Sequence, residues 1–266
     1  MRPSLAALML LAAPLAAQER IPSHCVALSQ GPAAVLPAAF GDPVPADAVR
    51  LTYLGHAMFL IQAPGASAVT DFTGFLGNVD FLPDVVIMNH AHSTHWTAHP
   101  DPAIPHVLRG WAEGGEAARH DLDLGAMLVR NVPTDIRDGA GGAEADGNSI
   151  FVFEAAGLCI GHLGHLHHEP TPEDYAFLGR MDVVMVPVDG GLTLDHGTLA
   201  RTLDRLRARV VIPMHWFGPG TLDAFLAGLP AGYAVERRQG SEITLTLGDL
   251  PDRPRVVVLE PRLLAD

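Results

Sequence analysis

Histidine is concentrated in three places along the chain, and each place follows an apolar run. The first holds His90, His92 and His95, directly after the apolar residues 85–88. In extended backbone, residues two apart project to the same side, so the imidazoles of His90 and His92 can converge on one ion. Because neutral imidazole is the common protein ligand for zinc and similar metals, this spacing predicts a transition-metal site.

The other two places lie in the second half of the chain. Residues 162–168 contain four histidines at the end of an apolar strand pattern, and His215 ends the apolar run 209–214. On an α/β scaffold, side chains at the ends of separate strands meet at one edge of the sheet. We therefore expect these histidines and the first group to form a single site.

Apolar patterning around the histidines predicts a mixed α/β domain. Short continuous apolar runs are typical of strands buried on both faces, and alternating runs of half-buried strands. Strands are expected at residues 49–62 (as a pair), 67–72, 85–88, 106–108, 127–132, 149–154, 158–163, 181–188, 209–214, 242–247 and 255–259. Helices are expected at residues 172–178, 197–207 and 222–229, with a glycine-rich loop at 140–147. Strands that first follow one another and then alternate with helices indicate two packed sheets with helices outside.

The charge of the chain argues against a nucleic-acid partner. The 17 basic residues are all arginine, and the formal net charge is −13. Phosphate binding needs concentrated positive charge, which this composition lacks. There is also no basic amphipathic stretch of the kind that binds a membrane surface. We therefore expect a small-molecule substrate, with no nucleic acid and no membrane contact once the leader has been removed.

Residues 1–17 have the pattern of a secretory signal peptide. Arg2 is followed by an apolar run over residues 5–15, and Ala16 and Ala17 offer a cleavage point before Gln18. The run is too short to span a bilayer. Cleavage would give a mature charge of 16 − 30 = −14 and a periplasmic or secreted protein.

The mature chain divides into a lead-in and one domain. Residues 18–48 are rich in Pro, Ala and Gly and are expected to be extended, and residues 49–266 are expected to form the domain. The two cysteines, Cys25 and Cys159, could pair in an oxidising compartment, but the sequence alone leaves open whether they approach closely enough.

Six segments in colinear order resemble the metallo-β-lactamase superfamily, in the branch that contains ascorbate-phosphate lactonases and other zinc-dependent hydrolases. The segments are residues 51–59, 69–72, 90–95, 157–165, 186–191 and 211–215. Residues 90–95 resemble the signature His-x-His-x-Asp-His. The likeness extends over roughly residues 50–229 and implies an α/β fold, a four-layer αβ/βα sandwich with metal at the edge of the two sheets.

The chain departs from the family pattern at three ligand positions. Thr94 stands where the signature has aspartate, and His165 stands where the family has a metal-bridging aspartate. The branch places another histidine before the hairpin, whereas residues 133–138 contain none. Two adjacent dications without a bridging carboxylate would repel each other strongly. We therefore expect one ion, zinc by default, with iron, copper or nickel as alternatives for an all-imidazole site.

The resemblance and the histidine pattern together give a candidate site. Three metal ligands are expected from a set of five, and the other two would support them: His90, His92, His95, His165 and His215. A metal-activated water would attack an ester, lactone or amide carbonyl, and His167 or His168 would carry the proton. Asp71 and Asp189 are expected to accept hydrogen bonds from ligand N–H groups. The alternative is a periplasmic metal-binding protein without catalysis, which the missing carboxylates favour.

Overall fold

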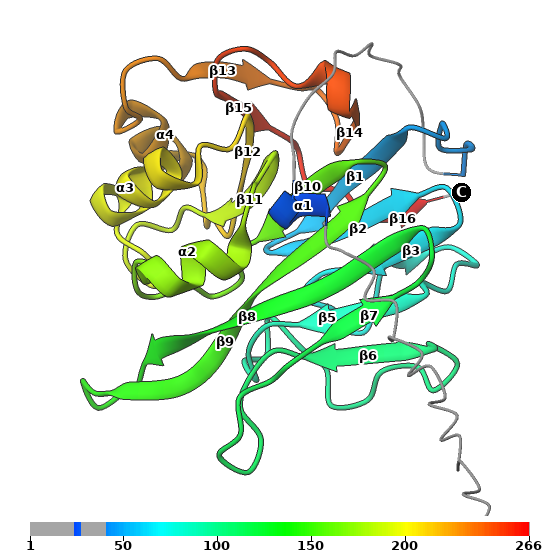
Figure 1. The fold of residues 1–266 in the computed structure, drawn as a ribbon, viewed down its shortest axis with the longest axis horizontal. Coiled ribbons are helices and arrows are strands. Elements are labelled where there is room, and N and C mark those ends of the chain that lie inside the picture. Colours follow the sequence, from blue (N-terminus) through cyan, green and yellow to red (C-terminus); the bar gives the residue numbers. More distant parts are fainter. Residues whose placement is uncertain (1–23, 28–40, 266) are drawn as a thin grey trace, which may run out of the picture.

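The computed structural model describes residues 24–27 and 41–265 (Figure 1). The predicted signal peptide at residues 1–17 and most of the predicted lead-in at 18–48 lie outside the described residues. Within the described part, no helix is long and apolar enough to cross a membrane.

Two β-sheets pack face to face (Figure 1). The six-stranded sheet has the order β14 (Glu242–Thr246), β1 (Ala48–Gly55), β2 (Met58–Ala63), β3 (Ala66–Val69), β5 (Val85–Met88) and β6 (His106–Arg109). The eight-stranded sheet has the order β13 (Ala234–Arg237), β15 (Arg255–Val258), β12 (Val210–Met214), β11 (Val183–Pro187), β10 (Leu158–His162), β9 (Ala143–Ala155), β8 (Met127–Arg137) and β7 (Asp121–Asp123). β4 (Gly77–Asn78) and β16 (Leu264–Ala265) form a small separate ladder.

The two faces of each strand enter different cores, as the period of two along a strand requires. In β9, Phe151 and Phe153 enter the core between the sheets, whereas Ile150 and Val152 face the helices. β5 divides in the same way, with Ile87 toward the other sheet. Such strands are apolar on both faces, which is why continuous apolar runs located them in the sequence.

Three helices cover the outer face of the eight-stranded sheet: α2 (Pro172–Leu178), α3 (His196–Leu206) and α4 (Pro219–Ala227). Thr171 caps α2 by accepting a hydrogen bond from the backbone N–H of Asp174. In α3, Leu199 and Leu203 are one turn apart and both are fully buried.

The outer face of the six-stranded sheet is covered differently. Its apolar side chains, among them Met58 and Met88, pack against Phe72, Leu76 and Trp96 from the connecting segments. In the described part of the chain this fourth layer is therefore built from loops and the β4–β16 ladder instead of helices. The predicted α/β sandwich of two packed sheets with helices outside is otherwise confirmed.

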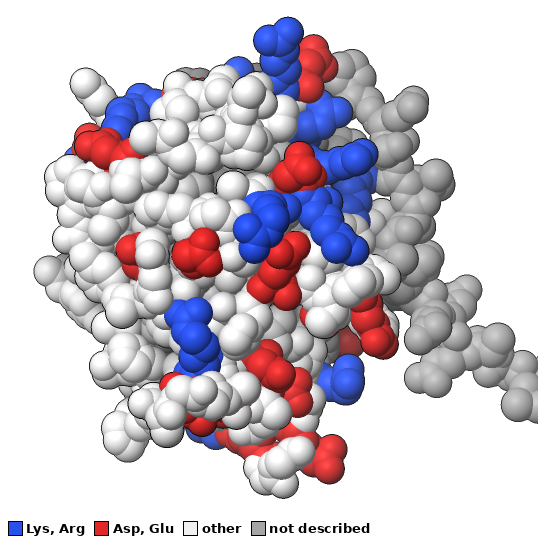
Figure 2. Space-filling model, turned by 90° about the vertical axis from the view of Figure 1, so that its left-hand side faces the viewer, with Lys and Arg blue, Asp and Glu red and all other residues white. Residues whose placement is uncertain are grey.

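The helical side carries both signs of charge. Figure 2 shows arginines lying among acidic side chains on this face. Some of them are paired: Arg201 Nε lies 3.3 Å from Glu169, and Arg237 lies 2.6 Å from Asp223. Exposed pairs of this kind contribute little to stability, so the fold depends on its apolar layers.

The prediction of a loop over residues 140–147 is wrong for most of this segment. β9 begins at Ala143, and β8 and β9 form a long hairpin whose tip is residues 138–142. Ladder hydrogen bonds from β8 compensate for the weak strand propensity of this segment. The carboxylate of Asp138 tightens the tip by accepting the backbone N–H groups of Ala140 and Gly142.

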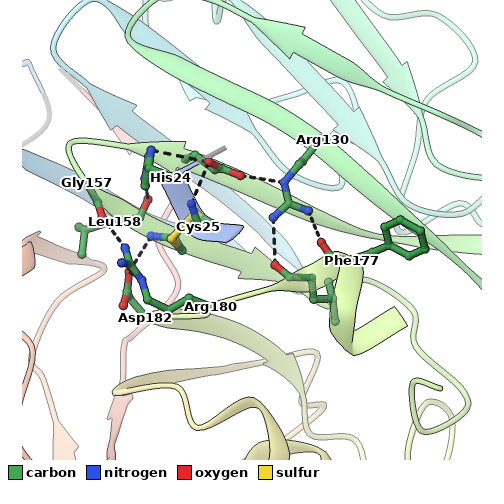
Figure 3. The surroundings of a disulfide bond; sticks show 11 residues. His24, Cys25, Arg130, Gly157, Leu158, Phe177, Arg180 and Asp182 are labelled. Atoms are coloured by element: carbon green, nitrogen blue, oxygen red, sulfur yellow. Dashed lines mark hydrogen bonds and ion pairs between the residues drawn. A yellow bond between two sulfur atoms is a disulfide. The ribbon is translucent and has the colours of Figure 1, made fainter. Parts of the chain in front are cut away.

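Cys25 and Cys159 form a disulfide, which settles the question left open by the sequence. Their Cα atoms are 5.6 Å apart, within the normal range. The bond joins α1 (His24–Ala27) to β10 (Figure 3). The backbone carbonyl of Cys25 also accepts a hydrogen bond of 3.0 Å from the N–H of Arg180.

Buried ion pairs surround this disulfide (Figure 3). The carboxylate of Glu154 accepts the backbone N–H of Cys25 at 3.4 Å and pairs with Arg130 Nε at 2.7 Å. Asp182 accepts the backbone N–H of Cys159 at 2.8 Å and pairs with Arg180. The N-terminal segment is thus attached to the domain by polar contacts as well as by the covalent bond.

Replacing Cys25 by Ser should lower the free energy of unfolding by about 2–4 kcal/mol, because the bond closes a long loop in the unfolded chain. Thermal or denaturant unfolding of the wild type and of Cys25→Ser would measure this. A thiol reductant should lower the midpoint of the wild type and leave that of the variant unchanged. Equal midpoints for the two proteins without reductant would contradict the prediction.

Candidate metal centre

The predicted site residues lie at the carboxyl ends of strands, where ligands bind in α/β sheets. Asp71 follows β3, and the segment 89–95 follows β5. His165, Asp189 and His215 follow β10, β11 and β12, which are parallel neighbours. The topology therefore brings side chains from both sheets to one edge of the sandwich.

Two histidines at this edge are each held by a buried carboxylate. His95 Nδ1 lies 2.6 Å from Asp71 Oδ2, and both side chains are fully buried. His215 Nδ1 lies 2.8 Å from Asp189 Oδ2, with the histidine 3% exposed. Carboxylate partners of this kind fix the tautomer of a metal-binding histidine. Asp71 and Asp189 thus occupy the positions predicted for them.

Both carboxylates are ionised acceptors. Burial raises the pKa of Asp71, but the neighbouring His95 outweighs it and holds the pKa below its ordinary value. Burial also raises the pKa of Asp189, and hydrogen bonds from His215 and Thr193 more than reverse that rise. An ionised carboxylate only accepts hydrogen bonds, so the Nδ1 atom of each histidine donates.

This arrangement turns two nitrogen lone pairs toward each other. With Nδ1 protonated, the Nε2 atom of a neutral His95 or His215 ring is an acceptor, and these two Nε2 atoms are 3.2 Å apart. Two lone pairs at this distance repel each other unless a proton or a metal ion lies between them. In a tetrahedral zinc site with Zn–N bonds of about 2.1 Å, ligand nitrogens are about 3.4 Å apart, so a pair 3.2 Å apart is close to that spacing.

His165 adds a third nitrogen beside this pair, since its Nδ1 lies 3.1 Å from His95 Nε2. Burial, with His95 and His167 nearby, lowers the pKa of His165 to about 2. Gly164 allows the close approach: its φ is 59°, and a Cβ atom there would collide with the side chains of Asn89 and Asn148.

His56 belongs to the same cluster, although the sequence analysis did not select it. One ring nitrogen from each of His56, His95 and His215 lies within 4.8 Å of the other two. The Nε2 of His56 is buried and has no hydrogen-bond partner. Burial, followed by the proximity of His215 and His95, lowers the pKa of His56 to about 3. His56 lies in the turn between β1 and β2 and has no other histidine near it in the sequence. A pattern based on groups of histidines therefore does not predict it.

His90 and His92 lie further from this centre. The expectation that they project to one side assumed extended backbone, but residues 90–95 turn: His92 N–H donates to His90 O and His95 N–H to His92 O. The ring centroids of His90 and His92 are 6.4 Å apart. His90 Nδ1 contacts the carbonyl of Gly147 at 2.7 Å, and the exposed His92 ring contacts Thr94 Oγ1 at 3.0 Å. Metal binding by these two residues stays a prediction.

The two histidines proposed to carry a proton differ in their surroundings. His167 Nδ1 accepts the backbone N–H of Arg137 at 2.8 Å, and its ring centroid is 4.7 Å from that of His165. Burial, together with Arg137, lowers the pKa of His167 to about 4. His168 is exposed. The catalytic roles of both stay predictions.

Arg137 ties the loops of the centre together. From the end of β8 its guanidinium donates to the carbonyls of residues 191, 192 and 193 at 2.9–3.0 Å and to that of His167 at 3.2 Å. The carboxylate of Asp189 accepts the N–H groups of the same three residues. The loop that holds Asp189 against His215 is thus bonded from both sides.

Three of the six non-glycine residues with positive φ in the described part of the chain lie at the centre. His56, Asp71 and His215 have φ values of 51°, 41° and 55°, in the left-handed region that residues other than glycine rarely adopt. Such conformations cost about 1–3 kcal/mol each and cluster at functional sites. The strain at these three positions supports a functional role for the centre.

Residues 50–215, more than half of the 266-residue chain, match the family model of a Beta-lactamase superfamily domain. A UPF0173 metal-dependent hydrolase from Methanospirillum hungatei is 25% identical over 230 residues, which is 80% of this chain and 96% of that protein. One from Nitratidesulfovibrio vulgaris is 28% identical over 195 residues, covering 63% and 80%. A structure described as a Zn-dependent hydrolase of the metallo-beta-lactamase superfamily, from Thermotoga maritima, has a TM-score of 0.57 at 27% identity and covers 80% of this chain and 100% of that one.

Replacing Asp189 by Asn should weaken zinc binding by about 10–100-fold, the usual effect of losing a carboxylate behind a ligand histidine. The amide cannot accept hydrogen bonds from His215 Nδ1 and from the loop N–H groups at the same time. Competition with a chromogenic chelator would measure the affinity, with the exposed Asp80→Asn as matched control. Unchanged affinity in Asp189→Asn would separate Asp189 from the metal centre.

Proposed function

The chain belongs to the β-lactamase superfamily, and from this premise we propose that it is an exported metal-dependent hydrolase of ester, lactone or amide bonds in small molecules. The relatives named above are metal-dependent hydrolases, which supports the reaction class. The single observation that carries the proposal is the pair of carboxylate-anchored histidines, His95 and His215, whose Nε2 lone pairs face each other at 3.2 Å.

A bound divalent ion would supply Lewis acidity, polarising a carbonyl oxygen and lowering the pKa of water from about 15.7 to about 7. The chain's own residues hold the ligand rings in place and orient the groups that can donate a proton. Asp71 and Asp189 keep the two ligand rings in one tautomer. His167 accepts the Arg137 N–H at Nδ1, so its neutral ring carries the proton at Nε2 and can donate a hydrogen bond. The exposed His168 can exchange a proton with solvent.

We propose one ion, zinc by default, at this centre. Imidazole is neutral, and the two ionised carboxylates contact the rings at Nδ1. The centre therefore has little negative charge to offset the repulsion between two adjacent divalent ions. The exposed Thr94 contacts His92 and replaces the aspartate of the family signature with a neutral hydroxyl.

An apolar side chain stands next to the centre. The ring of Phe217 lies 5.3 Å from that of His215 and 5.6 Å from that of His56, and Phe217 is 63% exposed. An exposed aromatic ring beside a polar centre is suited to the apolar part of a small ligand. This supports a substrate that combines a hydrolysable carbonyl group with an apolar group.

Export is supported by two features of the chain. Residues 1–17 have the signal-peptide pattern, and the Cys25–Cys159 disulfide is a bond that persists in oxidising compartments. We propose that the mature protein acts in the periplasm or outside the cell.

A second candidate function is metal binding without catalysis. The observation that favours it is that both carboxylates at the centre already accept hydrogen bonds from histidine, so neither is free to act as a general base. The two functions differ in whether metal-loaded protein turns over a substrate.

Zinc-loaded wild-type protein should hydrolyse at least one member of a panel of esters, lactones and amides, measured by product release. Chelation should abolish the activity and added zinc should restore it. His95→Ala should lower kcat/KM at least about 100-fold, because it removes a metal ligand and leaves the buried Asp71 carboxylate without its histidine partner. The exposed His99→Ala is the matched control. Inactivity of the metal-loaded wild type over the whole panel would favour the non-catalytic alternative.

Full-length protein expressed in a Gram-negative host should be recovered from the periplasmic fraction with its N-terminus at Gln18. Intact-mass spectrometry of that fraction measures both the cleavage site and the disulfide, which removes two hydrogens. Recovery of uncleaved protein in the cytosolic fraction alone would argue against export.

A further inference from the structure

We propose that His56 is a metal ligand and that the ion is held by the three imidazoles of His56, His95 and His215. The inference rests on the proposed function only in requiring that the protein bind a metal. The family signature places no ligand in the turn between β1 and β2, so the assignment depends on the arrangement of these side chains.

The three rings converge from three separate segments. Their centroids are 4.1 Å apart for His56 and His215, 5.0 Å for His56 and His95, and 5.1 Å for His95 and His215. One nitrogen of each ring lies within 4.8 Å of the other two. In the described part of the chain, the only other such group is His24 with the disulfide-bonded Cys25 and Cys159. Binding of one ion would draw these three nitrogens to the spacing of about 3.4 Å in a tetrahedral zinc site.

An unsatisfied ring nitrogen also supports a ligand role for His56. A buried polar atom without a partner is costly and rare in folded proteins. The Nε2 of His56 is such an atom, and it belongs to the cluster in which the lone pairs of His95 and His215 already face each other. A metal ion in the cluster would satisfy unpaired nitrogen at all three rings.

The backbone holds His56 in register with His215. The carbonyl of His56 accepts the N–H of His215 at 2.7 Å and the hydroxyl of Tyr53 at 2.8 Å. Both histidines have left-handed backbone, which the surrounding structure must enforce. Two residues from different sheets, joined main chain to main chain, thus present their rings to one point.

Other donors fit the third position less well. His165 Nδ1 lies 3.1 Å from His95 Nε2, but the group of mutually close ligand atoms consists of His56, His95 and His215 and does not include His165. The hydroxyl of Thr94 contacts His92, in an exposed position. With three histidine ligands the fourth position of the ion stays open for water or substrate, as in catalytic zinc sites. His165 lies next to the ligands, at 3.1 Å from His95.

Three variants separate the possibilities: His56→Ala, His95→Ala and, as matched control, the exposed His99→Ala. The measurements are zinc per chain by elemental analysis, zinc affinity by chelator competition, and the visible absorption of the cobalt(II) protein, which reports coordination number. We expect His56→Ala and His95→Ala to lose at least about 100-fold in affinity and to lose the four-coordinate cobalt spectrum. His99→Ala should keep the affinity and the cobalt spectrum of the wild type.

Equal affinity and spectrum in His56→Ala and the wild type would overturn the assignment. If His56→Ala fails to fold by circular dichroism, a zinc-edge anomalous map of the loaded wild-type protein decides. It should place the ion about 2.1 Å from a ring nitrogen of His56, and an ion at His90 and His92 instead would overturn the proposal. A wild type that binds zinc in the predicted place but hydrolyses nothing would contradict the proposed function and leave this ligand set intact.

Discussion

The structure of the centre depends on two buried hydrogen bonds between carboxylate and imidazole. Asp71 and Asp189 each take the proton-bearing Nδ1 of a histidine, and this fixes where the lone pair of each ring points. The two Nε2 lone pairs of the neutral rings then face each other at 3.2 Å, and their repulsion is relieved when a proton or a metal ion lies between them. The turns with positive φ, the loop around Asp189 and the hydrogen bonds of Arg137 all hold the two histidine rings in these orientations.

The sequence was sufficient for the features that depend on local patterning. β5 and β12 were located within a residue because each is a continuous apolar run, and α3 was located because its leucines recur at helical spacing. His95, His165 and His215 were expected to meet because each follows such a strand, and the structure brings them together. Strand ends thus predict a site well when the strands themselves are clear.

The remaining features depend on tertiary contacts that no local pattern encodes. His56 joins the cluster through backbone hydrogen bonds between two sheets. His90 and His92 were paired by a rule for extended chain, but the backbone turns after Asn89, whose N–H binds Asp71. The start of β9 was missed because its pairing with β8, and not its own glycine-containing sequence, makes it a strand. The loop-built fourth layer likewise reflects packing against scattered side chains such as Trp96 and Phe72.

The covalent link between Cys25 and Cys159 encloses residues 26–158 in a ring, and the exposed tip of the β8–β9 hairpin, residues 138–142, lies inside it. A protease that cuts once at this tip therefore opens the ring without releasing a fragment. The two chain fragments, one with His56 and His95 and the other with His165 and His215, would stay covalently joined until a reductant breaks the disulfide.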